Sequence, residues 1–208
     1  MSAGTFATAA VERNPAWAQL LGLCPLLAVS NSLVNALGLA LASGFVMLGS
    51  SLTISLLRGW IPHAARLPCF VLVIATFTTM SVLLLEAHAF DLYLRVALFI
   101  QIIVSNCMIL GRIEAFASRQ PPGQAALDAL GTACGFAIAL IVLGGVRELL
   151  GNGTLFAGMA QLFGPAADSW TVEVVANGGL LVVLLPPGAF LVGGLLLGLA
   201  NWIRIARA

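Results

Sequence analysis

The sequence predicts an all-α polytopic membrane protein, and three observations support that fold class. Of the 208 residues, 61% are hydrophobic and only 8% are charged, whereas a soluble domain carries about 25% charged residues. The mean hydropathy is +1.07. Several apolar segments approach or exceed the roughly 20 residues that a helix needs to cross a bilayer. We therefore expect a single integral membrane domain over residues 1–208, surrounded by lipid.

Turn and breaker residues divide the apolar sequence into six expected transmembrane helices. Asn14-Pro15 offers a cap and a first-turn proline for the first helix, and Ser43-Gly44 allows a tight turn into a short second one. Pro68 precedes the third helix, and Pro121-Pro122-Gly123 precedes the fifth. The expected helices span about 16–42, 44–58, 68–86, 92–117, 125–148 and 176–202.

The basic residues, all nine of them arginines, predict the orientation of these helices. With six crossings, seven arginines fall toward the side of the N-terminus, and only Arg95 and Arg147 fall toward the other. Trp17, Trp60 and Trp202 also fall at one face, as an interfacial aromatic belt requires. The positive-inside rule then places both termini in the cytoplasm. There is no basic stripe with interleaved aromatic residues, so we expect no nucleic acid partner.

A weak internal repeat appears when the sequence is compared with itself at an offset of 75 residues. Val29-Ser30-Asn31 then falls on Val104-Ser105-Asn106. Three helices per unit is an odd number, so the second unit would begin on the opposite side of the membrane. Chance similarity between apolar sequences is the alternative. The repeat predicts two inverted three-helix units, repeat one at about 14–88 and repeat two at about 90–204.

The first and fourth expected helices are each interrupted by polar or helix-breaking residues. Cys24-Pro25 and Ser30-Asn31-Ser32 interrupt the first, and Gln101 and Ser105-Asn106 interrupt the fourth. Proline removes a backbone donor, and Ser and Asn side chains can bond to backbone groups that a break frees. Unwound backbone is tolerated at membrane depth only where protein or a cavity buries it. We therefore expect broken half-helices that face the interior.

Cys24 and Cys107 flank these two interruptions and are candidate metal ligands. Thiolates bind soft metals and iron–sulfur clusters. A two-iron cluster needs four protein ligands, so a second chain would have to supply two. The alternative, which these residues alone leave open, is that both cysteines are small buried hydrophobes. For Cys69 and Cys134 we expect a packing role, the latter in a stretch of small residues suited to close helix contact.

Charged residues near the helix ends offer fewer functional signals. Arg112 and Glu114 are interpreted as interfacial anchors, with a partner or ion site as the alternative. Asp128, Arg147 and Glu148 are expected near the ends of the fifth helix. We therefore expect no carboxylate relay at the bilayer midplane.

Four segments resemble the family that contains the E-type membrane component of the Rnf complex and its close relative, the D-type component of the sodium-pumping NADH:quinone reductase. They are LLGLCPLLAVSNSLVNALGLALA (20–42), SLLRGWIP (55–62), VSNCMILGRIEAFAS (104–118) and VRELLGNGTLF (146–156). The resemblance implies six helices in an inverted repeat of half-helices. It also implies that Cys24 and Cys107 are cluster ligands, with two more from a homologous A-type subunit of opposite topology, closing a [2Fe-2S] cluster between the chains.

The resemblance further implies an enzymatic role only within a complex, since no complete catalytic site is recognised in this chain. That complex couples electron flow between ferredoxin and NAD to translocation of Na⁺ or H⁺ in the bacterial inner membrane. Its B, C, D and G subunits would be further partners, carrying FMN, riboflavin and additional Fe–S clusters. The alternatives are the D-type component of the Na⁺-translocating quinone reductase, a secondary transporter with inverted repeats, and a purely structural scaffold.

Overall fold

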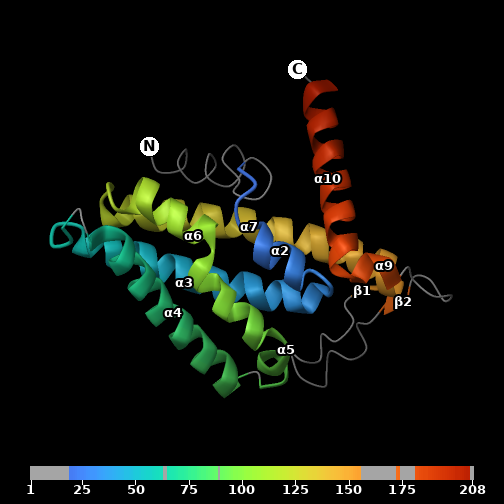
Figure 1. Ribbon diagram of the computed structural model, residues 1–208, viewed down its shortest axis with the longest axis horizontal. Helices are drawn as coiled ribbons and strands as arrows, with labels where there is room; N and C mark the ends of the chain where they lie inside the picture. The colour runs from blue at the N-terminus through green and yellow to red at the C-terminus, as the bar shows by residue number, and fades with distance from the viewer. Residues whose placement is uncertain (1–18, 63–64, 89, 156–171, 174–180, 207–208) are drawn as a thin grey trace.

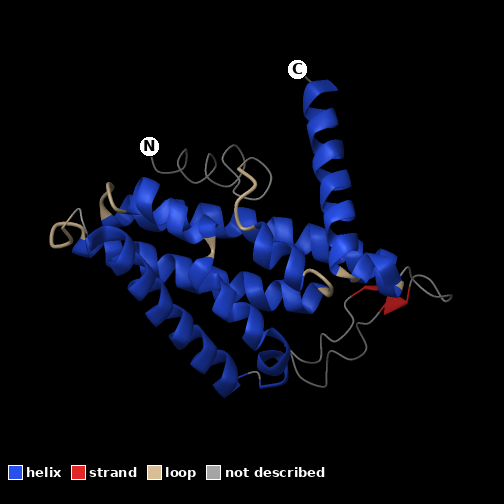
Figure 2. Cartoon of the chain, in the orientation of Figure 1, coloured by secondary structure: helices blue, strands red, loops and turns tan. Residues whose placement is uncertain are grey.

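A computed structural model describes residues 19–62, 65–88, 90–155, 172–173 and 181–206, and helices dominate it (Figure 2). The α-helices are α2 (Leu23–Val29), α3 (Leu33–Leu57), α4 (Arg66–His88), α5 (Phe90–Gln101), α6 (Cys107–Arg112), α7 (Pro122–Asn152), α9 (Leu181–Leu184) and α10 (Pro186–Ala206). A 3₁₀ stretch, η3 (Ile102–Ser105), precedes α6, and a π-helical stretch, η4 (Ile113–Ala117), follows it. The short strands β1 (Thr154–Leu155) and β2 (Val172–Glu173) pair antiparallel.

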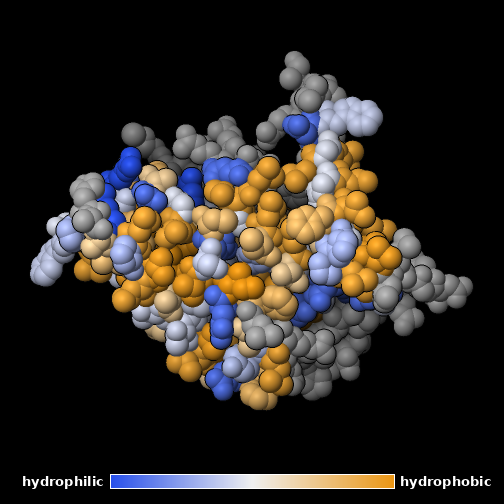
Figure 3. Space-filling model, in the orientation of Figure 1, coloured by the Kyte–Doolittle hydropathy of each residue, from blue (hydrophilic) through white to orange (hydrophobic). Residues whose placement is uncertain are grey.

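The helices confirm a multi-pass membrane protein. Within the described part of the chain, four helical stretches are long and apolar enough to cross a bilayer: Leu33–Leu57, Arg66–His88, Phe99–Ala117 and Pro122–Asn152. Large apolar side chains such as Leu41, 67% exposed, and Leu72, 69% exposed, point outward, and apolar residues cover much of the surface in Figure 3. The first and last expected helices begin in residues 16–18 and 176–180, outside the described residues, so six crossings and the inverted repeat stay predictions.

The predicted turn at Ser43-Gly44 is wrong, because α3 continues through it to Leu57. Ser43 donates from Oγ to the carbonyl of Ala40 at 3.1 Å, a bond that the helix accommodates. Gly44 lies inside the helix where it faces α7, and an added Cβ there would lie 3.8 Å from the Cβ of Ala133, an ordinary van der Waals distance. The first two expected helices are instead the short α2 and the long α3, which runs back past α2 after a turn at residues 30–32 (Figure 1).

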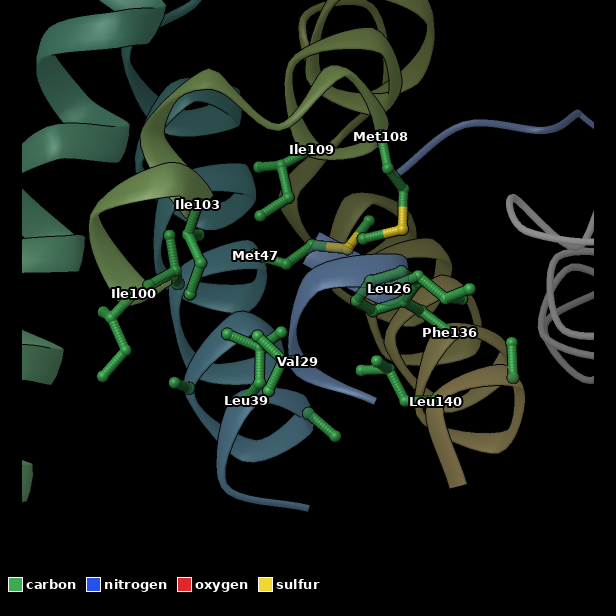
Figure 4. Packing of buried hydrophobic residues seen from close by; sticks show 14 of the residues in the cluster. Leu26, Val29, Leu39, Met47, Ile100, Ile103, Met108, Ile109, Phe136 and Leu140 are labelled. Atoms are coloured by element: carbon green, nitrogen blue, oxygen red, sulfur yellow. The ribbon is translucent and has the colours of Figure 1, made fainter. Parts of the chain in front are cut away.

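The core forms where α3 lies along α7, with α2 and α6 packed over them (Figures 1 and 4). Small residues bring α3 and α7 together: a Cβ added at Gly144 would lie 3.1 Å from the Cβ of Ala36. Leu26 of α2, Met108 of α6 and Phe136 of α7 are buried in the same cluster (Figure 4). The short helices α2 and α6 therefore pack against the long helices α3 and α7.

The last expected helix is divided at Leu185, between α9 and α10. Pro186 and Pro187 are the first two residues of α10, where prolines are tolerated because their missing N–H groups would have no intrahelical partner. Their rings prevent α9 from continuing through them. The axis of α10 turns away from the rest of the molecule (Figure 1).

Gly188 is required for this sharp junction. A Cβ at Gly188 would lie 2.2 Å from the carbonyl oxygen of Val182 and 2.5 Å from the Cα of Val183, both backbone atoms. Gly188→Ala should therefore force α9 and α10 apart and destabilise the protein by about 1–3 kcal/mol, as overpacking does. Thermal unfolding in detergent measures this. The matched control is Gly198→Ala on the same helix, where nothing lies within 4 Å; equal stability of the two variants would contradict the prediction.

Candidate functional site

Both interruptions expected at Ser-Asn sequences are confirmed. α2 ends at Val29, Ser32 is extended (φ −143°, ψ 143°), and α3 begins at Leu33. In the second interruption, η3 ends at Ser105, Asn106 is extended (φ −66°, ψ 111°), and α6 begins at Cys107. Both Val-Ser-Asn triplets therefore lie at helix breaks, but Asn106 is the N-cap of the next helix, whereas Asn31 precedes the N-cap Ser32.

Cys24-Pro25, in contrast, does not interrupt a helix. Pro25 lies in the first turn of α2, where its lack of an N–H removes no intrahelical hydrogen bond. The chain enters α2 through two residues of positive φ, Leu20 at 55° and Gly22 at 75°. The left-handed conformation at Gly22 costs glycine little, whereas a side chain there would be strained. The sequence thus marked the start of a half-helix, not a break within a longer one.

The two candidate cysteines lie in the first turns of α2 and α6. Cys24 is the second residue of α2, Cys107 is the first residue of α6, and both are exposed. The two starts adjoin: a Cβ at Gly22 would lie 3.3 Å from Oδ1 of Asn106 and 3.4 Å from the Cβ of Met108. The fold therefore brings together the turns that carry Cys24 and Cys107.

The other two cysteines lie on different helices. Cys69 is half-buried in the first turn of α4, and Cys134 is exposed in the interior of α7. Neither is part of the turns at Gly22 and Asn106. They therefore serve as internal comparisons for the first pair.

Asn106 caps α6 and leaves one polar atom unused. Its Oδ1 accepts a hydrogen bond from the backbone N–H of Met108 at 3.0 Å. The side chain is only 2% exposed, and its Nδ2 is buried with no hydrogen-bond partner among the described residues. An unpaired buried donor costs roughly 1–3 kcal/mol, so this amide is a donor in need of an acceptor beside the paired helix starts.

Arg147 binds the carboxyl-terminal ends of two short helices at once. Its side chain, from a residue 1% exposed on α7, donates from Nη1 to the carbonyl of Leu27 at 3.0 Å and to Oγ of Ser30 at 2.7 Å. It also donates from Nε to the carbonyl of Val183 at 3.1 Å and from Nη2 to that of Leu184 at 2.8 Å. The last carbonyls of a helix lack intrahelical partners, so this one guanidinium satisfies the ends of α2 and α9.

Glu148, the next residue, accepts a hydrogen bond from the N-terminal end of a helix. It is fully buried, and its Oε2 accepts a hydrogen bond from the backbone N–H of Leu33 at 2.7 Å. Leu33 begins α3, and its N-cap Ser32 makes no side-chain cap bond. A carboxylate is favoured at a helix start by both the free N–H groups and the helix dipole. Arg147 and Glu148 together fix the break between α2 and α3.

A second buried charge pair ties α6 to α7. Arg112, the last residue of α6, makes a salt bridge through two nitrogens with the carboxylate of Asp128, and both side chains are buried. Arg112 also lies over the Phe116 ring, 5.8 Å from its centroid. Arg112 therefore has its charge partner within the fold, and the interfacial anchor and the ion site both stay predictions.

The importance of Arg147, Glu148 and Asp128 was missed in the sequence, which suggested only their nearness to helix ends. A signal was present, because charged residues inside an otherwise apolar membrane helix are costly and almost always have a partner or a function. What the sequence lacked was the identity of those partners, since Leu27 and Leu184 are 120 and 37 residues from Arg147.

The arrangement fits half of a soft-metal or iron–sulfur site. Two exposed thiols lie at adjoining helix starts, where backbone N–H groups favour an anionic group. Asn106, whose Nδ2 has no partner among the described residues, immediately precedes one of them. Among the described residues no cluster of three or more His, Cys, Asp or Glu side chains could hold a metal ion. A four-ligand cluster would thus need two further ligands from elsewhere.

These features define a class: a multi-pass helical membrane protein with interrupted helices, two of which begin side by side at cysteine-bearing turns. Residues 3–197 match the model of the Rnf-Nqr subunit family of membrane proteins. The chain belongs to this Rnf-Nqr membrane-subunit family.

Several relatives named as E subunits of ion-translocating oxidoreductase complexes share about half of their residues with the chain. The chain is 52% identical to that of Pseudomonas paraeruginosa, over 92% of this chain and 81% of the relative. It is 51% identical to the protein of the same name from Pseudomonas aeruginosa strain LESB58, with the same coverage. It is 50% identical to the one from Shewanella sp. strain W3-18-1, over 92% of this chain and 83% of the relative.

Replacing Arg147 by Met should destabilise the packing of the C-terminal end of α2 against α7. The substitution keeps an unbranched apolar side chain but strands the carbonyls of two helix ends, and hydrogen bonds to a charged group are worth about 1.5–3 kcal/mol each. We expect a clear fall in thermal stability and faster labelling of Cys24 by a maleimide, with Arg147→Lys in between. Arg119→Met, at an exposed arginine, is the control; an Arg147→Met protein as stable as this control would refute the assignment.

Asp128→Asn should destabilise the protein by about 3–5 kcal/mol, because it leaves the buried charge of Arg112 without its counter-charge. The double variant Arg112→Met/Asp128→Leu should recover most of that stability, since both charges are then gone. Denaturation of wild type, Arg112→Met, Asp128→Leu and the double variant, the four members of this cycle, measures the coupling. Purely additive effects would show that the two side chains do not depend on each other.

Proposed function

We propose that this chain is the E-type membrane component of an ion-translocating oxidoreductase complex of the Rnf type. Identity of about half over 92% of the chain to relatives with that name supports the assignment. The single structural observation that supports it most is the meeting of the α2 and α6 starts, each with an exposed cysteine in its first turn.

In this proposal, Cys24 and Cys107 supply two ligands of a [2Fe-2S] cluster, and a homologous A-type subunit of opposite topology supplies the other two. When bound, such a cluster accepts and releases one electron at a time. The two thiols would bind as thiolates, and the free N–H groups of the first turns of α2 and α6 would offset their negative charge. Leu26, Met108 and Phe136 beneath these turns exclude water from one side.

The wider role follows from the family. The complex would couple electron transfer between ferredoxin and NAD to movement of Na⁺ or H⁺, with B, C, D and G subunits that carry FMN, riboflavin and further Fe–S clusters. The chain would lie in the bacterial inner membrane as six crossings in two inverted repeats, with both termini cytoplasmic, as the arginine distribution favours.

One alternative within the same family has specific support. The matching family model covers Rnf and Nqr subunits alike, so a D-type component of the Na⁺-translocating NADH:quinone reductase is the second candidate. The names of the similar proteins favour the E-type component of an Rnf complex. Identification of the subunits that co-purify with the chain separates the two, because only the Rnf assignment predicts a ferredoxin-linked complex.

Substituting either candidate ligand should abolish the cluster. We expect Cys24→Ser and Cys107→Ser each to remove the two-iron absorbance and the electron paramagnetic resonance (EPR) signal of the reduced, purified complex, because oxygen is a poor substitute for a thiolate ligand of iron. Cys69→Ser and Cys134→Ser are matched controls on α4 and α7 and should keep both signals.

Two outcomes would defeat the proposed function. A wild-type complex without iron bound to this chain would favour a transporter or a scaffold. A full cluster signal in Cys24→Ser or Cys107→Ser would show that the ligands lie elsewhere.

A further inference from the structure

We propose that the side-chain amide of Asn106 donates a hydrogen bond to a sulfur of the redox group held by Cys24 and Cys107, and thereby raises its reduction potential. The inference rests on the proposed function, but it assigns a role to a residue that is not itself a ligand. Asn106 would be a positioning and tuning residue, acting on the electronics of the group and not on its attachment.

The orientation of the Asn106 amide is fixed by its own backbone contacts. Oδ1 is engaged by the N–H of Met108 at 3.0 Å, so the amide cannot be reversed without losing that bond. Nδ2 is then the atom left over, and it is buried without a partner among the described residues. Because the side chain is only 2% exposed, water does not readily take the place of the missing acceptor, and in the proposal the two turns shift enough on binding the group for a sulfur to reach Nδ2.

The surroundings of Asn106 indicate which acceptor is missing. The residue immediately precedes Cys107. Its side chain also lies against Gly22, where a Cβ would come within 3.3 Å of Oδ1, and Gly22 is two residues before Cys24. The amide thus lies between the two turns that carry the proposed ligands. Thiolate and sulfide sulfurs accept hydrogen bonds, and a group assembled on these turns would bring such acceptors to the free donor.

A donor at this place has a predictable effect on the potential. Reduction adds one electron, and hence one negative charge, to the group. A hydrogen bond from a neutral amide stabilises the more negative, reduced form more than the oxidised one. Hydrogen bonds to the sulfurs are among the factors that set cluster potentials. Loss of the Nδ2 donor should therefore lower the reduction potential.

The experiment compares variants that keep the helix cap but lose the amide. Asn106→Ser retains a side-chain oxygen that can cap α6, and Asn106→Asp retains the shape and the capping oxygen while adding a negative charge. Asn31→Ser is the control, because Asn31 corresponds to Asn106 at the 75-residue offset but is exposed, with its Oδ1 accepting from Nδ2 of Asn35 at 3.3 Å. Each variant is purified as the whole complex, and the EPR signal of the group is titrated against the solution potential.

We expect Asn106→Ser to lower the equilibrium constant for reduction about tenfold, which is about 59 mV for a one-electron couple. Asn106→Asp should lower it further, and Asn31→Ser should leave it unchanged. In the wild-type complex, proton–deuterium exchange should remove one proton coupling to the reduced group, and that coupling should be missing in Asn106→Ser. This spectroscopic test uses wild type as well, so it stands even if one variant fails to assemble.

Two results separate this inference from the function on which it rests. If the wild-type complex shows no two-iron signal, the proposed function fails, and the role of Asn106 fails with it. If the signal is present but lacks the exchangeable coupling, or if its potential is the same in Asn106→Ser and wild type, only the role of Asn106 is overturned.

Discussion

A helix that stops inside a membrane protein must find partners for the backbone groups that its end leaves free, and this constraint determines the architecture around α2. The carbonyl ends of α2 and α9 need donors, and the amide start of α3 needs an acceptor. Two consecutive residues of α7 meet both needs, because the side chain of Arg147 has only hydrogen-bond donors and that of ionised Glu148 has only acceptors. α7 is long and continuous, so it can hold three helix ends in one place.

The N-terminal turns of α2 and α6 have fewer hydrogen-bond partners from other helices than the C-terminal ends of α2 and α9. Gly22 has no side chain with which to cap α2, and Asn106 caps α6 while leaving its own Nδ2 unpaired among the described residues. Both cysteines lie within these first turns and are exposed. The chain thus satisfies the carbonyl ends of α2 and α9 internally, while the amide starts of α2 and α6 lie next to exposed cysteines and a buried unpaired donor. This electrostatic pattern suits an anionic group shared with another chain.

The sequence predicted what depends on local chemistry and missed what depends on distant contacts. The two Ser-Asn pairs correctly marked two breaks, because Ser and Asn side chains compete with helical hydrogen bonding wherever they occur. Ser43-Gly44 misled, since a glycine within a continuous helix looks the same in sequence as a glycine required for a turn. The role of Arg147 was not predictable, because the carbonyls that it binds come from Leu27 and from residues 183–185.

In the proposed function, dividing the ligands between two chains would make assembly and cofactor binding a single event. Each chain would carry an incomplete site, so the binding free energy of the group would add to the stability of the complex and not to that of either chain by itself. The same reasoning accounts for keeping an unpaired donor beside exposed thiols. Its cost in the isolated chain would be recovered only when the acceptor arrives, which favours the correctly assembled complex over the chain alone. The rigid support from α7 is needed for that selectivity, because a half-site on loose helices could close on the wrong partner or on none.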